Sequence, residues 1–112
     1  MISEQTVEEC LDWLVKNATP AAKARAARLY LEDYSKSMKA ILMKKSGQDT
    51  AAAQEREALA NPEYLKHLQM LHDAVVDDER FRWLNTAAEV KIEVWRSEQA
   101  NQRAQARLTE NR

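Results

Sequence analysis

Few residues of this chain have types and spacing suited to catalysis or metal binding. His67 and His72 are five residues apart, so on a helix they do not share a face as two zinc ligands four residues apart would. Asp73 and Asp77 are four apart, but no histidine or third carboxylate completes a ligand set. The sole cysteine, Cys10, lies among apolar residues at helical spacing, which indicates a buried, inert thiol. The sequence therefore predicts no metal, no cofactor and no enzymatic activity.

Cations near aromatic rings are the stronger functional signal. Lysine and arginine neutralise phosphates, and exposed rings stack on the bases of single strands. Residues 20–45 hold seven bases against two acids, whereas residues 46–80 hold three bases against eight acids. Trp83 lies off the centre of its apolar stripe and is a better candidate for an exposed ring than Trp95. The candidate nucleic-acid-binding residues are Arg25, Arg28, Lys36, Lys39, Trp83, Lys91, Arg96 and Arg103.

Each part of this signal has a second interpretation. The basic face of residues 20–45 is either a solvated surface or an anion-binding one. Trp95 is a core residue in the alternative interpretation, with the nearby arginines paired to Glu89, Glu93 and Glu98.

The elements that must position these residues are helices. One glycine and two prolines in 112 residues leave too few turn residues for a sheet protein, and good helix formers dominate the composition. We expect an all-α fold, a helical hairpin or bundle in a single domain spanning residues 1–112. The expected helices cover about 7–17, 20–45, 51–59 and 62–108, with a frayed tail over 105–112. Thr19-Pro20 and Asn61-Pro62 each read as a cap followed by a first helical residue, and Gly47 ends the second helix.

Two apolar patterns predict where the helices pack. Ala24, Ala27, Leu31, Tyr34, Met38 and Ile41 follow the alternating spacing of a coiled coil. In the last helix, the apolar residues of 64–75 lie on a different side from those of 81–95, and the change falls at residues 77–80. Either the helix breaks there or it continues and serves two partners; we expect it to continue. The predicted oligomer contacts are Leu31, Tyr34, Met38, Ile41, Phe81, Leu84, Ala88, Ile92 and Trp95.

Residues 53–75 (AQEREALANPEYLKHLQMLHDAV) and 82–103 (RWLNTAAEVKIEVWRSEQANQR) resemble small helical phage proteins encoded among replication and recombination genes. The helix pattern over residues 20–105 is similar to that of the UvsY-type recombination mediators. The resemblance implies single-stranded DNA binding, homo-oligomer assembly and help in loading a recombinase onto DNA covered by single-strand-binding protein. It transfers no binding residue. The chain is slightly acidic overall, so DNA binding would use its segregated basic faces.

The leading hypothesis is thus a non-enzymatic, homo-oligomeric accessory protein of phage DNA recombination that binds single-stranded DNA. The alternative is a helical protein–protein adaptor or scaffold without nucleic-acid contact. No stretch has the character of a signal peptide or a membrane span, so we expect no membrane partner and a location in the host cytoplasm.

Overall fold

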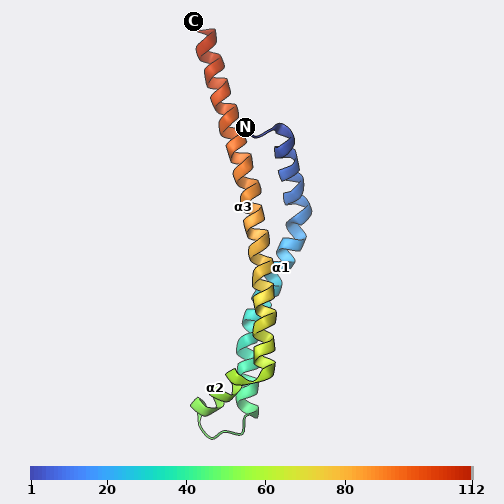
Figure 1. Ribbon diagram of the computed structural model, residues 1–112, viewed down its shortest axis with the longest axis vertical. Helices are drawn as coiled ribbons and strands as arrows, with labels where there is room; N and C mark the ends of the chain where they lie inside the picture. The colour runs from blue at the N-terminus through green and yellow to red at the C-terminus, as the bar shows by residue number, and fades with distance from the viewer. Residues whose placement is uncertain (112) are drawn as a thin grey trace. The chain divides into compact units, whose positions relative to one another are not determined.

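The computed structural model describes residues 1–111, which form three α-helices and no strand: α1 (Glu4–Lys45), α2 (Ala51–Ala60) and α3 (Pro62–Glu110) (Figure 1). The predicted all-α class and the long C-terminal helix are confirmed. Helix α3 continues through residues 77–80 without a break in its helical hydrogen bonding, as expected.

One predicted boundary is wrong, because residues 7–17 and 20–45 belong to a single helix. Pro20 lies inside α1, where its ring removes one backbone donor but does not end the helix. Alanines and other good helix formers follow it, so the helix has no sequence reason to stop there beyond the proline itself. The helix also begins earlier than expected, at Glu4. Ser3 caps it, since its Oγ accepts a hydrogen bond from the Thr6 amide at 3.1 Å.

The connections on either side of α2 follow the predicted turn chemistry. Gly47, with φ of +71°, takes the left-handed conformation after the last residue of α1. Thr50 caps α2 by accepting from the Ala53 amide at 3.2 Å. Asn61 caps α3, since its Oδ1 accepts from the Glu63 amide at 2.8 Å, with Pro62 as the first helical residue.

The tail does not fray where the sequence suggested. Helix α3 extends to Glu110, although every described residue from 101 onward is exposed. The alanine, glutamine and arginine residues of this stretch favour a helix without tertiary packing. Arg112, the end of the predicted frayed segment, lies outside the described residues.

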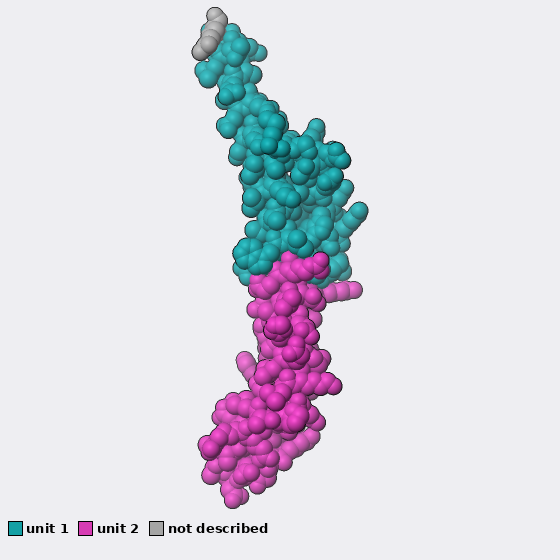
Figure 2. All heavy atoms as spheres, in the orientation of Figure 1, with its two compact units in different colours: residues 1–20, 81–112 teal, residues 21–80 magenta. Residues whose placement is uncertain are grey.

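The chain divides into two compact units, each built from part of α1 and part of α3 (Figure 2). Unit 1 comprises Met1–Pro20 and Phe81–Arg112, and unit 2 comprises Ala21–Arg80 with all of α2.

Unit 2 is an antiparallel helical hairpin, and its contact seam differs from the predicted one by one residue in each heptad. Ala27, Tyr34 and Ile41 are exposed, whereas their neighbours Arg28, Ser35 and Leu42 face α3. The apolar pattern misled because two of the true contact positions carry polar side chains, each satisfied by a partner across the hairpin. On the two helices, the buried or half-buried seam residues are Ala24, Arg28, Leu31, Ser35, Met38, Leu42, Tyr64, His67, Leu71, Ala74 and Asp78.

Unit 1 repeats this arrangement with a short stretch of α1. Val7 and Cys10 are buried, and Ala88 is buried opposite them on α3, where it helps to line a groove beside Cys10. The burial predicted for Cys10 is confirmed. The Ile2 amide donates to Glu98 Oε2 at 3.1 Å, which ties the start of the chain to α3. The second half of α3 therefore packs on α1 of the same chain, and it does so through Phe81, Asn85, Ala88, Ile92 and Trp95.

Candidate nucleic-acid interface

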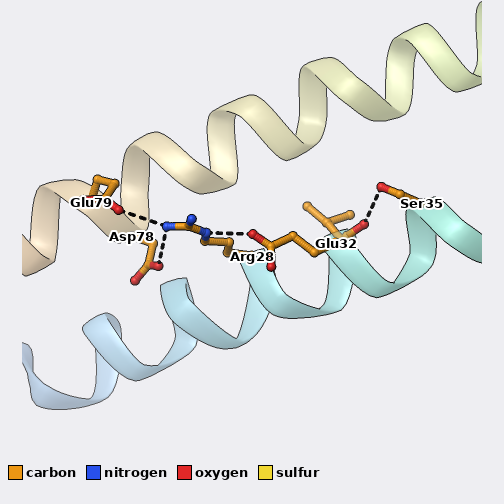
Figure 3. Close-up of polar contacts among 6 residues, drawn as sticks. Arg28, Glu32, Ser35, Asp78 and Glu79 are labelled. Carbon is orange, nitrogen blue, oxygen red and sulfur yellow. Dashed lines mark hydrogen bonds and ion pairs between the residues drawn. The ribbon is translucent and has the colours of Figure 1, made fainter.

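Arg28 has three carboxylate partners, more than any other candidate cation for which an ion pair is described. Its Nε donates to Glu32 Oε1 at 2.9 Å within α1. Its Nη1 donates across the hairpin to Asp78 Oδ2 at 3.2 Å and to Glu79 Oε1 at 3.1 Å (Figure 3). Three acids around one guanidinium leave no excess positive charge for a phosphate. We therefore assign Arg28 to the fold of unit 2 rather than to a binding surface.

The same contacts stabilise the charged form of Arg28. Hydrogen bonds to Glu32, and then to Glu79, raise the pKa of the guanidinium above its ordinary value. A raised pKa in the folded state contributes stability that is fully present below the pKa of the unfolded state, and is lost only above it. Because that ordinary value is already far above neutral, the arginine side of this cluster does not titrate under physiological conditions.

Lys39 is likewise engaged within unit 2. Its Nζ lies 2.7 Å from Glu55 Oε1, a contact that joins α1 to α2. Both side chains are partly exposed, so solvent screens the pair and its net contribution to stability is small. Of the four cations predicted on α1, two are thus paired in the fold and two, Arg25 and Lys36, are exposed.

Arg25 and Lys36 share one face of α1, since eleven residues are close to three full turns. Neither forms an ion pair with any of residues 1–111, and the same holds for Lys23, Lys44 and Lys45. Five of the seven bases of residues 20–45 therefore remain exposed along α1 in unit 2. These five cations cover about 33 Å of helix.

The candidates of unit 1 do not converge on one surface. Trp83 is 68% exposed, so its indole is open to solvent as predicted. Arg96 pairs with Glu93 at 2.9 Å, and both side chains are largely exposed. Trp83 and Arg96 are thirteen residues apart, which places them on different sides of α3. Lys91 is exposed beside the groove next to Cys10.

Arg103 is exposed in the last part of α3, beyond the segment that packs on α1. It lies seven residues after Arg96, and therefore near the same side of the helix. Together they offer two arginines on one side of α3, one of them already beside a carboxylate.

The residues predicted as oligomer contacts divide into two groups. Ala88 is buried, and Leu31, Met38, Phe81, Ile92 and Trp95 are half-buried against the other helix of the same chain. Tyr34, Ile41 and Leu84 are exposed. The half-buried position of Trp95 agrees with the core interpretation of that residue. Tyr34, Ile41 and Leu84 are therefore the predicted contact residues that remain available to a second molecule.

A buried polar pair escaped the sequence analysis. His67 is 3% exposed, and its Nε2 lies 2.6 Å from Ser35 Oγ across the hairpin of unit 2. The rings of Tyr34 and Tyr64 lie beside the imidazole, with centroids at 5.5 and 6.3 Å. Arg28, Ser35 and Leu42 are spaced seven residues apart and therefore share one face of α1. This spacing could have indicated Ser35 as a contact position, but a search restricted to apolar residues does not detect it.

Among residues 1–111, no group of three or more histidine, cysteine or acidic side chains is arranged to hold a metal ion. Over the same residues, none of the helices combines the length and the apolar character that a bilayer span requires. Neither models of protein families, nor curated proteins, nor solved structures match this chain. The resemblance to UvsY-type mediators stays a prediction.

Proposed function

We propose that this protein is a non-enzymatic accessory factor of phage DNA recombination, which binds single-stranded DNA as a homo-oligomer and assists the loading of a recombinase. The observation that carries the DNA-binding part is the pair Arg25 and Lys36, which share one face of α1 within a set of five exposed cations in unit 2 that also includes Lys23, Lys44 and Lys45. Excess positive charge on one helix attracts a polyanion, although the whole chain has a net charge of −1. The helical pattern shared with recombination mediators supplies the biological context.

Within this set, Arg25 and Lys36 are the proposed phosphate contacts. Arg28 and Lys39 lie near the same side of α1 but hold the hairpin and α2 together. Trp83, which belongs to unit 1 and is 68% exposed, is a separate candidate for base stacking.

Fluorescence anisotropy with a labelled oligothymidine tests this proposal. We expect binding at low salt that weakens as salt rises, because phosphate contacts release counterions. Arg25→Ala combined with Lys36→Ala should weaken binding. It should also reduce the slope of log binding constant against log salt concentration by about 1.4, because each phosphate contact with a single strand contributes about 0.7 to that slope. The matched control is Arg56→Ala, which removes an exposed cation from α2 instead. Absence of binding by the wild-type protein at low salt would exclude DNA binding.

An adaptor function is the second candidate, and a specific surface favours it. Trp83, Val90 and Val94 are exposed on one side of α3 in unit 1. Glu89 and Glu93 flank the two valines along a shallow groove. Acidic flanks suit a protein partner better than a nucleic acid. If Trp83→Ala leaves oligothymidine binding unchanged, this stripe is not part of the DNA surface.

A further inference from the structure

An apolar groove runs along one side of the hairpin in unit 2, between α1 and α3. It has a volume of about 340 Å³, and its walls are almost wholly apolar. Its lining residues are Tyr30, Leu31, Tyr34, Met38, Glu63, Lys66, His67 and Met70.

The rim of this groove exposes large apolar side chains. Tyr30 is 66% exposed, Tyr34 38% and Met70 52%, and Ile41 continues the same side of α1 two turns further on. The rings of Tyr30 and Tyr34 stack with centroids 6.1 Å apart and planes 13° apart. The two stacked rings form a broad apolar surface whose side chains already have few accessible rotamers. A partner that binds over them therefore costs little side-chain entropy.

We infer that this groove is the self-association surface of the protein, and that a second copy of the same chain covers it. The inference rests on the homo-oligomer of the proposed function, but not on DNA binding.

Charge on the two edges of the groove makes the surface self-complementary. Lys23 and Lys44 lie on the tyrosine side of α1, about two turns before Tyr30 and about three turns after Tyr34, with Asp33 between them. The facing edge of α3 carries three acids and two bases: Glu63, Asp73, Asp77, Lys66 and Arg80. The α1 edge of one copy is therefore opposite in sign to the α3 edge of the other. A two-fold arrangement uses this match twice.

The acidic edge also argues against single-stranded DNA as the occupant. A phosphate backbone that follows the groove would pass Glu63, Asp73 and Asp77, and the two cations of this edge, Lys66 and Arg80, are too few to compensate the three acids. Arg25 and Lys36, the proposed phosphate contacts, lie on another side of α1, so assembly through the groove leaves them open.

Light scattering coupled to gel filtration, and sedimentation equilibrium, test the inference with the full chain. Tyr30→Ser combined with Met70→Ser should raise the dissociation constant of self-association at least tenfold. The matched control is Leu65→Ser, which removes an exposed apolar side chain from α3 outside the groove. Circular dichroism checks that all variants stay helical; the mutated side chains are exposed, so helicity should not fall.

The outcomes separate the alternatives. A lower mass for Tyr30→Ser/Met70→Ser, with an unchanged mass for Leu65→Ser, supports the groove. A wild-type monomer at 100-fold the working concentration, or loss of assembly in Leu65→Ser alone, overturns it. So does a double variant that keeps its mass and loses oligothymidine binding, because DNA would then occupy the groove. Lys36→Glu distinguishes the two proposals, since it should weaken DNA binding at unchanged mass.

Discussion

His67 and Arg28 show how polar residues at contact positions hold the hairpin of unit 2. The imidazole is nearly free of solvent, and the Ser35 hydroxyl at 2.6 Å is its hydrogen-bond partner. A buried polar group that loses its partner retains the full desolvation penalty. Arg28 is more exposed than His67, so its contacts with Asp78 and Glu79 are partly screened. Loss of the Ser35–His67 contact should therefore lower the free energy of unfolding more than loss of an Arg28 contact.

Replacing Ser35 with alanine tests that ranking. Because His67 would stay buried without a partner, we expect the free energy of unfolding to fall by about 1–3 kcal/mol. Ser37→Ala, an exposed change two residues away, should stay within about 0.5 kcal/mol of wild type. Urea unfolding followed by circular dichroism measures both. Equal stability of the two variants would show that water replaces the hydroxyl.

At the scale of the elements, the sequence was sufficient for helix type, for the Asn61 cap of α3 and for Gly47 after the end of α1. Thr50 caps α2. The sequence was insufficient for the packing faces. A search for apolar residues selects Tyr34 and Ile41, while the structure places Ser35 and Leu42 inward. Tertiary partners decide such positions, and their pairing lies far apart in the sequence.

The candidate site was less predictable than the helices, for the same reason. Arg25 and Arg28 look alike in the sequence, but only Arg28 meets acids from α3, 50 and 51 residues away. Lys39 meets Glu55 because the turn after α1 brings α2 back alongside it. The exposure of Trp83 was predicted from helical spacing, whereas Leu84, which the same spacing predicted to be a contact, is also exposed.

Pro20 gives a prediction at the same scale. A proline in a helix interior costs about 3 kcal/mol relative to alanine, through the missing donor and a clash with the preceding turn. Pro20→Ala should therefore raise the free energy of unfolding by about 1–3 kcal/mol, measured by urea titration. Thr19→Ala, its exposed neighbour, should change it by no more than about 0.5 kcal/mol.

A Pro20→Ala variant no more stable than wild type would contradict the continuous α1. It would return the boundary to Thr19-Pro20, where the sequence pattern placed it.

For the whole molecule, the ratio of surface to core is the dominant feature. Only Val7, Cys10, Leu42, Ala58 and Ala88 are buried apolar residues among those described, and two of them are alanines. Each alanine removes little apolar area from water, so one chain alone has a small hydrophobic stabilisation. Association is the direct way for such a chain to gain more.

Thermal stability should therefore depend on protein concentration. Because assembly stabilises only the folded state, the midpoint of thermal unfolding should rise across a hundredfold increase in concentration. Tyr30→Ser combined with Met70→Ser should flatten that dependence, and Leu65→Ser should preserve it. Calorimetry at several concentrations measures the effect; a constant midpoint for the wild-type chain would indicate a stable monomer.

The polar layers of unit 2 also decide how its two helices are aligned. Apolar heptads repeat every seven residues, so leucines and alanines alone would tolerate a slip of one repeat. Such a slip would bring His67 level with Arg28 or with Leu42 instead of Ser35, and would separate Arg28 from Asp78. Leucine at Arg28, Ser35 and His67 would increase the buried apolar area. It would also remove the polar contacts that favour the observed helix alignment over one shifted by seven residues.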